Sequence, residues 1–335
     1  MWEHFTRMVV FSPFFDTRST WAPPAWLYQD AYAIYVGSSL ESEHPEWILR
    51  DASGNRLYIP YGNPPNQFAA DISNPAFRSY WIERVKAKLS HGYAGIYVDD
   101  VDMWANTGNA KDEKRAPISG LTGQPISDEA WREYLAGFMQ ELRQAIPGYE
   151  IAHNNVWYAD GGAANRGTTA AVVRHQIEQA DVLNLERGAR DSGLTGGTGS
   201  WSLYNLFTYI DEVHALGRAV KLGGGTYEPA AMEYNLAAYL LISTGRDYIS
   251  DGGSSENVKS FWSGWSVNLG DAIGPRERSP SGLWSRRFSN GVVYLLEPGA
   301  ATQTISLATT MKSATLGSVA SVTLSARQGA VLTSP

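Results

Sequence analysis

The feature that most constrains this chain is an apolar segment, residues 93–98, that runs directly into three carboxylates, Asp99, Asp100 and Asp102. An isolated carboxylate is very costly in a low-dielectric interior, so a buried strand has no structural use for such residues. Acids at the carboxyl end of a parallel strand are, however, where β/α enzymes keep their chemistry. The segment therefore predicts a buried parallel strand whose end carries functional side chains.

Strand-like and helix-like segments alternate over residues 1–270, which is typical of a parallel sheet covered by helices. Asn74 and Pro75 are start signals for one helix, and Ser127 is the N-cap of another. Helices are predicted to begin near residues 75, 128, 203 and 230. Strands are predicted at residues 7–11, 31–36, 67–71, 94–98, 149–153, 181–185, 219–222 and 247–250. Eight strands in about 250 residues predict a (β/α)8 TIM barrel.

The texture of the sequence changes near residue 270. Residues 271–281 are rich in glycine, proline and charge, which indicates a linker. Strand-like segments at 283–288 and 292–296 flank a Ser-Asn-Gly turn, and no helical periodicity follows. We therefore predict a catalytic barrel over residues 1–270 and a small antiparallel, β-sandwich-like domain over 271–335. So small a domain is expected to pack on the barrel.

The composition excludes several functional classes. A net charge of -7 argues against a nucleic acid partner. No run of about 18 apolar residues is present, so no membrane span is expected. The absence of cysteine excludes disulfides, thiolate catalysis and cysteine-ligated metal. Neither HExxH nor GxSxG occurs and the 6 histidines are scattered, so we expect no metal and no cofactor.

Aromatic residues indicate a carbohydrate partner. They make up 12% of the chain, with 12 tryptophans, and many lie beside glycine, asparagine or aspartate, as Trp104, Trp157 and Tyr227 do. Rigid rings next to polar donors are how proteins hold sugars, with the apolar face of the sugar on the ring. Such a partner favours a secreted or cell-surface bacterial protein; no signal peptide is visible in the sequence, and a cytoplasmic location is left open. The oligomeric state is not encoded in any recognisable pattern.

Two acids at strand ends are what a glycosidase requires. Side chains alternate along a strand, so Tyr97 and Asp99 share the face expected to line the barrel, and Asp100 points to the other. A second apolar strand leads in the same way to Glu186, which shares its face with Asn184. A glycosidase needs one ionised carboxylate and one protonated acid. Asp99 suits the first role and Glu186 the second.

Other polar and aromatic residues lie at the ends of the same strands or in the loops that follow. We predict that these residues contact the sugar: Asp71, Tyr97, Asp100, Asp102, Trp104, His153, Asn154, Asn155, Trp157, Asn184, Arg187, Lys221, Tyr227 and Asp251. Arg187 could also influence the ionisation of its neighbour Glu186. Residues 223–225 are three glycines without a phosphate-binding motif, and they are expected to let the backbone approach a ligand.

Each of these interpretations has a structural alternative. Asp99 or Asp100 could cap the next segment, or the three aspartates could bind Ca²⁺, although no twelve-residue calcium loop accompanies them. Glu186 could form a salt bridge with Arg187 or Arg190. At the level of function, the alternatives are a sugar-binding barrel without catalysis and a metal-dependent hydrolase or lyase built on the aspartate cluster.

Three stretches of the sequence resemble a known group of proteins. They are Glu46-Trp-Ile-Leu-Arg-Asp51, Asp71-Ile-Ser-Asn-Pro75 and Gly95-Ile-Tyr-Val-Asp-Asp-Val-Asp102. The chain resembles barrel-forming glycosyl hydrolases known mainly from sequence, which are similar to the endo-α-1,4-polygalactosaminidase family. The segment Leu283-Trp-Ser-Arg-Arg-Phe-Ser-Asn-Gly291 resembles the β domain that follows many such barrels. The resemblance covers nearly the whole chain.

The resemblance implies roles for the two acids. In those relatives the acid after the fourth strand is taken as the nucleophile and the Glu after the sixth as the acid/base, and Asp99 and Glu186 match these positions. It also implies an α-linked oligo- or polysaccharide. Our hypothesis is a retaining mechanism. The galactosaminidase pattern has an acid two residues before the nucleophile, where this chain has Tyr97, so the resemblance supports the reaction class rather than the same substrate.

Overall fold

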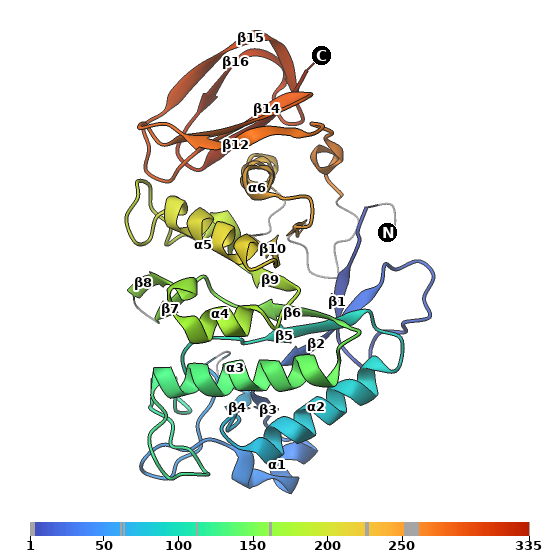
Figure 1. The fold of residues 1–335 in the computed structure, drawn as a ribbon, viewed down its shortest axis with the longest axis vertical. Coiled ribbons are helices and arrows are strands. Elements are labelled where there is room, and N and C mark those ends of the chain that lie inside the picture. Colours follow the sequence, from blue (N-terminus) through green and yellow to red (C-terminus); the bar gives the residue numbers. More distant parts are fainter. Residues whose placement is uncertain are drawn as a thin grey trace. The chain divides into compact units, whose positions relative to one another are not determined.

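The computed structural model of the chain describes residues 4–60, 62, 64–111, 113–160, 163–224, 228–250 and 261–334. The chain forms two compact units, residues 1–183 and 184–335, called unit 1 and unit 2 below. Figure 1 shows their elements, and each unit is described by itself. No helix in the described ranges is both long enough and apolar enough to cross a membrane.

The central sheet of unit 1 is parallel, and its strands succeed one another in chain order. The strands are β1 (Met8–Val10), β2 (Ala25–Asp30), β5 (Gly95–Asp99), β6 (Glu150–Asn154) and β9 (Val182–Leu185), and β9 continues into unit 2. All residues of β5 before Asp99 are buried, because an apolar parallel strand is covered on both faces. The strands predicted at 7–11, 94–98, 149–153 and 181–185 are confirmed to within two residues.

Two predicted barrel strands are wrong. Residues 31–36 and 67–71 contribute only the short strands β3 (Ala33–Tyr35) and β4 (Gln67–Ala69), which pair antiparallel with each other. The parallel strand next to β5 is β2 instead. Its sequence follows two prolines and ends in Gln29 and Asp30, so it lacks the apolar run by which a buried strand is recognised.

The helices of unit 1 begin where the sequence places their caps. Asn74 accepts a hydrogen bond from the N–H of Ala76, and Ser127 accepts one from Ala130, which confirms both predicted helix starts. The helices are α1 (Ser39–Glu43), α2 (Pro75–Leu89), α3 (Asp128–Ala145) and α4 (Ala171–Ile177), with 3-10 turns η1 (Pro45–Trp47) and η2 (Gly167–Thr169) and a hairpin of β7 (Tyr158–Asp160) and β8 (Ala163–Arg166).

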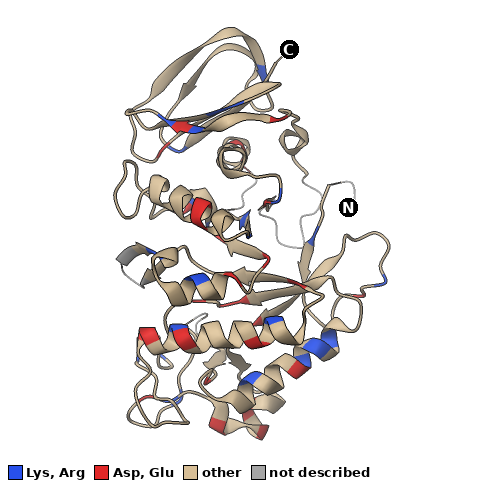
Figure 2. Ribbon diagram, in the orientation of Figure 1, with Lys and Arg blue, Asp and Glu red and all other residues tan. Residues whose placement is uncertain are grey.

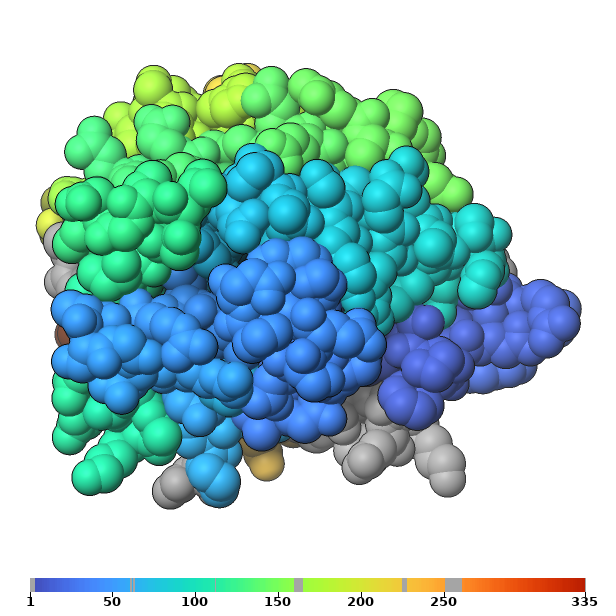
Figure 3. Space-filling view, turned by 90° about the horizontal axis from the view of Figure 1, so that it is seen from below, coloured from blue at the N-terminus to red at the C-terminus, as the bar shows by residue number. Residues whose placement is uncertain are grey.

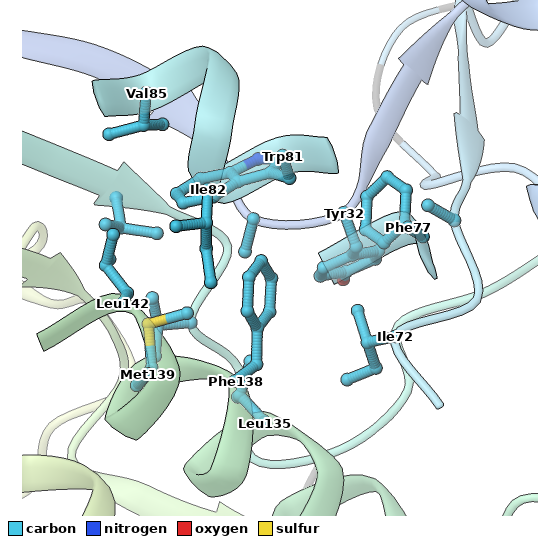
Figure 4. Packing of buried hydrophobic residues seen from close by; sticks show 14 of the residues in the cluster. Tyr32, Ile72, Phe77, Trp81, Ile82, Val85, Leu135, Phe138, Met139 and Leu142 are labelled. Carbon is cyan, nitrogen blue, oxygen red and sulfur yellow. The ribbon is translucent and has the colours of Figure 1, made fainter. Parts of the chain in front are cut away.

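Helices α2 and α3 form the main core of unit 1 together. Figure 4 shows Trp81 and Ile82 of α2 facing Phe138 and Met139 of α3. The rings of Trp81 and Phe138 meet edge to face, with centroids 5.0 Å apart. Burying each such side chain contributes about 1.5–3 kcal/mol. The indole Nε1 of Trp81 also donates to the backbone oxygen of Asp30 at 2.8 Å, which ties α2 to the end of β2.

Charged residues in unit 1 support the same helices. Figure 2 shows basic residues toward the C-terminal end of α2, where Lys86 and Lys88 lie in the last turn. Asp128 and Glu129 lie in the first turn of α3. Both arrangements complement the helix dipole, each charge contributing about 0.3–1 kcal/mol.

Unit 2 begins with the end of β9 and adds parallel strands β10 (Ala219–Leu222) and β11 (Tyr248–Ile249). These confirm the strands predicted at 219–222 and 247–250. Its helices are α5 (Leu203–Ala215) and α6 (Pro229–Ile242), with 3-10 turns η3 (Gly188–Arg190) and η5 (Ser263–Ser266). The two units contribute seven parallel strands in chain order, and the predicted TIM-barrel fold class with a C-terminal antiparallel domain is confirmed.

The C-terminal residues form one antiparallel sheet of six strands, in the order β12-β13-β14-β17-β15-β16. The strands are β12 (Ala272–Arg278), β13 (Leu283–Phe288), β14 (Gly291–Leu296), β15 (Gln303–Ser313), β16 (Gly317–Leu324) and β17 (Gln328–Thr333). Within unit 2 this sheet packs against α6 (Figure 1). The Arg286 guanidinium donates to the backbone oxygens of Leu240 and Ser243, both at 3.0 Å, and so completes the C-terminal end of α6. The division of the chain at residue 270 stays a prediction.

Candidate active site

Asp99 ends β5 and is held by three donors within unit 1. Its Oδ1 accepts from the backbone N–H of Asp100 at 2.9 Å and from Nδ2 of Asn154 at 2.6 Å. Its Oδ2 accepts from the hydroxyl of Tyr28. Asn154 ends β6 and Tyr28 lies on β2, so the neighbouring strands on both sides fix the orientation of this carboxylate. Donors aimed at a carboxylate stabilise its negative charge.

The backbone just after Asp99 is strained. Asp100 has a φ of 58°, a left-handed conformation that costs a residue with a side chain about 1–3 kcal/mol. This turn is what directs the N–H of Asp100 back to the Asp99 carboxylate. Asp102 is buried, and its backbone oxygen accepts from Nε1 of Trp131 at 3.0 Å. Strain of this kind clusters at functional sites, where the surrounding structure maintains it.

A second carboxyl, which the sequence analysis missed, lies beside Asp99. Asp30 ends β2 and is the register partner of Asp99 across the parallel pair. It is 3% exposed, and its two oxygens lie 3.0 Å from the hydroxyls of Tyr28 and Tyr35. Burial raises the pKa of Asp30 against these hydrogen bonds, and the charge of Asp99 adds to the shift. Reading residues 25–30 as a strand would have identified Asp30 as a strand-end acid.

The tyrosines around this pair are structural partners and proton donors. Tyr28 and Tyr97 stack on the face that carries Asp99, with ring centroids 6.0 Å apart and planes at 19°. Burial and the nearby carboxylates raise the pKa of Tyr28, so its hydroxyl keeps its hydrogen. Burial and the charge of Asp30 raise the pKa of Tyr35 to about 12. Tyr97, predicted to share the face of Asp99, therefore packs within the cluster.

A cavity of about 450 Å³ reaches this cluster from the surface of unit 1. Tyr28 and Asp30 form part of its wall, and Phe14, which is 88% exposed, lies at its rim. Segments from the N-terminal loop, from α1 and its neighbours, and from α2 line it, and Figure 3 shows them adjoining in dark blue, blue and cyan. Its volume is in the range of small-molecule sites.

The end of β6 carries three of the predicted residues. His153 is fully buried, its Nδ1 lies 2.6 Å from Nε2 of Gln176, and burial lowers its pKa to about 3, so the ring is neutral. Asn154 binds Asp99 directly. Asn155 is 4% exposed, and neither polar atom of its amide has a hydrogen-bond partner among the described residues. An unsatisfied buried amide is uncommon and indicates a group that a ligand or water completes.

Aromatic residues follow β5 and β6. Trp104 stacks on Tyr158, with ring centroids 5.7 Å apart and planes at 15°. Trp157 meets Tyr158 edge to face at 5.4 Å and is 5% exposed. Tyr158 therefore lies between the half-buried Trp104, on which it stacks, and the buried Trp157, which it meets edge to face.

Unit 2 carries the second predicted acid. Glu186 follows β9 in an exposed turn, and Arg187 beside it is also exposed. Two residues earlier, on the same strand face, the buried Asn184 accepts from Nζ of Lys221 at 2.7 Å. This pairing orients Lys221 and Asn184 on neighbouring strands, and their contact with a sugar stays a prediction.

The predicted glycine stretch explains how Glu186 is positioned. The N–H groups of Gly223 and Gly224 donate to the backbone oxygens of Leu185 and Glu186, at 2.9 and 2.6 Å. A Cβ added at Gly223 would lie 2.0 Å from the backbone oxygen of Glu186. The described glycines thus allow the chain after β10 to lie directly against the backbone of the acid. The expected approach of this backbone to a ligand stays a prediction.

Of the remaining predicted residues, Asp71 has its own set of donors, and two others lie outside the described ranges. Asp71 is 1% exposed, and its carboxylate accepts from Ser73 and, at 2.7 Å, from the N–H of Gly120, which stabilises the loop after β4. Tyr227 and Asp251 lie outside the described residues. Within the described ranges, no group of three or more His, Asp or Glu side chains is arranged to hold a metal ion.

The sequence matches a protein family over most of its length. A family described as hypothetical glycosyl hydrolase family 15 matches residues 20–292. No curated protein matches the chain.

Several solved structures are similar in fold. The glycoside hydrolase domain of PelA from Pseudomonas aeruginosa is 15% identical, with a TM-score of 0.47 over 73% of this chain and 87% of that chain. A noncanonic maltogenic α-amylase, AmyB from Thermotoga neapolitana, is 14% identical, with a TM-score of 0.46 over 92% and 77%. An Anoxybacillus α-amylase is 11% identical, with a TM-score of 0.46 over 93% and 76%. The family assignment rests on the family match.

Proposed function

This chain belongs to hypothetical glycosyl hydrolase family 15, and from that membership we propose that it cleaves a glycosidic bond with Asp99 as nucleophile and Glu186 as acid/base. The observation that carries the proposal is the setting of Asp99. Its carboxylate ends a buried parallel strand, is oriented by donors from both neighbouring strands, and precedes a strained left-handed residue.

In the proposed reaction Asp99 attacks the anomeric carbon as Glu186 protonates the leaving oxygen. A glycosyl ester forms on Asp99 and the glycosidic bond breaks. Glu186 then takes a proton from water, which attacks the anomeric carbon and releases Asp99 as a carboxylate. The donors from Tyr28, Asn154 and the Asp100 N–H keep the Asp99 carboxylate aimed at the anomeric carbon in both steps.

The substrate that we propose is an α-linked oligo- or polysaccharide. The resemblance to the endo-α-1,4-polygalactosaminidase group supports the α linkage. The stacked rings of Trp104 and Tyr158, and the cavity of about 450 Å³ whose wall includes Tyr28 and Asp30, are suited to sugar rings. Polysaccharide degradation would place the protein outside the cell, and we propose a secreted or cell-surface location, which fractionation of the producing cells would test.

The test is a screen of plant, fungal and bacterial glycans for reducing-end release by the wild type, Asp99→Ala and Glu83→Gln. Glu83 is a matched acid whose side chain is 69% exposed and pairs only with Lys86 among described residues. We expect release by the wild type and Glu83→Gln, and a loss of about 10³-fold or more in Asp99→Ala. Release that survives Asp99→Ala would move the nucleophile to Asp100 or Asp251. Silence from all three proteins would favour the sugar-binding alternative.

Two further measurements on the same reaction, the configuration of the product and the effect of EDTA, distinguish the remaining alternatives. Retention predicts that the anomer released first, followed by proton NMR, has the configuration of the substrate; the opposite anomer would indicate inversion. Activity that persists in EDTA is expected. Activity abolished by EDTA and restored by a divalent cation would indicate metal-dependent hydrolysis on the aspartate cluster.

A further inference from the structure

Tyr28 presents one hydrogen to two carboxyl groups. Its hydroxyl oxygen lies 3.0 Å from Oδ1 of Asp30 and within hydrogen-bonding distance of Oδ2 of Asp99. A phenol carries a single hydrogen and can donate it to only one of them. If Tyr28 donates to Asp99, the contact with Asp30 joins two oxygens and needs another hydrogen between them.

The only side chain that can supply this hydrogen at that contact is Asp30 itself. If both carboxyls were ionised, two charges would occupy opposite register positions on β2 and β5, and one of them would face the lone pairs of Tyr28. If Asp30 is protonated, its hydroxyl donates to Tyr28 and Tyr28 donates to Asp99. Every oxygen in the chain of hydrogen bonds is then satisfied, with one negative charge instead of two.

The surroundings favour the proton on Asp30 rather than on Asp99. Asp99 has two further donors, Asn154 and the N–H of Asp100, which stabilise its charge. Asp30 accepts from Tyr35 and, more weakly, from its own backbone N–H, and at 3% exposed it incurs a desolvation cost that outweighs them.

The charged groups that face Asp30 support the same assignment. Asp99 on β5 repels its ionised form, and Lys88 on α2 attracts it. Lys88 is turned to Gln29, with its Nζ 2.8 Å from Oε1, and burial and the charge of Arg84 lower the pKa of Lys88. Lys88 forms no ion pair with Asp30 among the described contacts. The charge that acts most directly on the ionisation of Asp30 is therefore that of Asp99.

We propose that Asp30 is protonated in the resting enzyme and acts as a positioning residue, directing the hydroxyl hydrogen of Tyr28 to Asp99. The proposal rests on the proposed function, in which Asp99 is the nucleophile. The proton stays on Asp30 throughout the reaction. Asp99 loses its charge when it forms the glycosyl ester and regains it when the ester is hydrolysed, while Tyr28 remains its donor in both states.

Infrared difference spectroscopy tests the proton directly, without a substrate. The spectrum of the wild type minus that of Asp30→Asn, at neutral pH, is expected to contain the C=O stretching band of a protonated carboxyl. Glu233, a buried acid of unit 2, is present in both proteins and cancels. A difference spectrum that contains only carboxylate bands would overturn the proposal. This result is independent of whether Asp99 is the nucleophile.

Kinetics test the positioning role. Asp30→Asn keeps a donor toward Tyr28, and its kcat/KM is expected to stay within about threefold of the wild type, because Asp99 stays oriented. Asp30→Ala and Tyr28→Phe are expected to lower kcat about 10²-fold through misplacement of Asp99. Activity kept in Asp30→Asn but lost in Asp30→Ala, with equal thermal melting, is the signature of positioning, because only asparagine keeps a donor toward Tyr28.

Three outcomes separate the hypotheses. If kcat/KM of Asp30→Asn falls as far as that of Asp30→Ala, with thermal melting unchanged, an ionised Asp30 is needed and the proposal is overturned. A kcat that stays at the wild-type level in Tyr28→Phe would reduce Asp30 and Tyr28 to a structural role. Full activity in Asp99→Ala would contradict the proposed function, while the infrared result would still decide the protonation of Asp30.

Discussion

Buried carboxylates occur in both units of this protein, and their donors are arranged in two different ways. In unit 2, the two carboxylate oxygens of Glu297 accept from Nη2 and Nε of Arg278, at 2.8 and 3.0 Å. In unit 1, Asp30 and Asp99 compete for the hydroxyl of Tyr28. A carboxylate with its own complete set of donors holds a fold together. Two carboxyl groups that share one hydroxyl donor keep one proton and one negative charge between them. The positions of that proton and that charge can serve catalysis.

Asp247 is the fullest example of the structural arrangement. Its two oxygens accept, all at 2.8 Å, from the N–H of Val220, from the N–H and hydroxyl of Thr244, and from Nε2 of His214. Burial raises the pKa of Asp247, but the hydrogen bonds from His214, Thr244 and Val220 outweigh it and hold the pKa below the ordinary value of 3.8. This carboxylate joins α5, β10 and the turn before β11.

Glu233 lies between these extremes. It is buried on α6 and accepts from the hydroxyl of Ser313 and the N–H of Val331, both at 2.9 Å, so it joins α6 to the C-terminal sheet. Burial raises the pKa of Glu233 despite these two bonds. A raised pKa therefore does not by itself indicate catalysis; the shared donor of Asp30 is what distinguishes the two regions.

The largest expected effect comes from removing one charge in each region. Asp99→Asn should lower kcat by about 10³-fold or more while thermal stability stays level or rises, because a neutral amide replaces an ionised carboxylate that serves catalysis rather than the fold. Glu297→Gln should leave kcat unchanged and destabilise the fold by about 2–3 kcal/mol, less than the 3–5 of a fully buried pair because Arg278 is 19% exposed. Urea unfolding and steady-state kinetics measure both.

The comparison would fail if the two variants behaved alike. A strong loss of stability in Asp99→Asn would make Asp99 a structural residue of the Glu297 kind. A loss of activity in Glu297→Gln at unchanged stability would give the unit 2 carboxylate a functional role that its donors do not suggest.

Gly223→Ala should produce the next largest effect. The added Cβ would lie 2.0 Å from the backbone oxygen of Glu186, so the chain must shift there, and a displacement of about 1 Å at a catalytic group can cost about 10²-fold in kcat. The matched control is Gly137→Ala on α3, where nothing lies within 4 Å and alanine should stabilise the helix by about 1 kcal/mol. Unchanged kcat in Gly223→Ala, with stability retained, would argue against Glu186 as acid/base.

The sequence predicts the parts of this fold that local patterns encode. The helix start at Asn74 and the cap at Ser127 are short-range signals, and both are present as expected. The apolar run before Asp99 likewise identifies β5 within one residue. Such features need no knowledge of distant contacts, because capping and burial are expressed within a few residues.

The parts that sequence reasoning missed depend on distant partners. The strand β2 ends in polar residues, and only its pairing with β5 shows that Tyr28 and Asp99, 71 residues apart, meet. Asp30 was overlooked for the same reason. Asn154 was predicted to bind sugar, but its role as a donor to Asp99 also needed the neighbouring strand. Pairwise contacts of this kind are not encoded in any local period.

The pH dependence of stability should have opposite signs in the two regions. The lowered pKa of Asp247 means that its contribution is present above pH 3.8 and is lost as the pH falls through the lowered value. The raised pKa of Asp30 means that its contribution is fully present below pH 3.8 and is lost as the pH rises through the raised value. Urea unfolding across acidic to neutral pH measures the two slopes.

Asparagine variants isolate each contribution. Asp247→Asn should flatten the loss of stability at the acid end, and Asp30→Asn should flatten the decline toward neutral pH, each relative to the wild type. Slopes that change in the same direction in both variants would mean that Asp30 is ionised and structurally paired, like Asp247.

The smallest effects on stability are expected at helix N-caps. Here too, a side chain with one hydrogen-bond partner can be compared with one that has several. Ser127 of unit 1 only accepts, from the N–H of Ala130, so Ser127→Ala should cost about 0.5–1 kcal/mol. The fully buried Ser202 of unit 2 accepts from Asn205 and also donates to the backbone oxygen of Gly199 at 2.6 Å. Its alanine variant removes both side-chain hydrogen bonds, while the backbone bonds from Asn205 N–H to Ser202 and from Ser202 N–H to Gly199 remain. It should cost about 1–2 kcal/mol, with kcat unchanged in both proteins. Equal losses of stability in urea unfolding would mean that water replaces the second hydrogen bond of Ser202. The number of hydrogen-bond partners of a buried polar group would then say less about its role than the comparison of the carboxylates suggests.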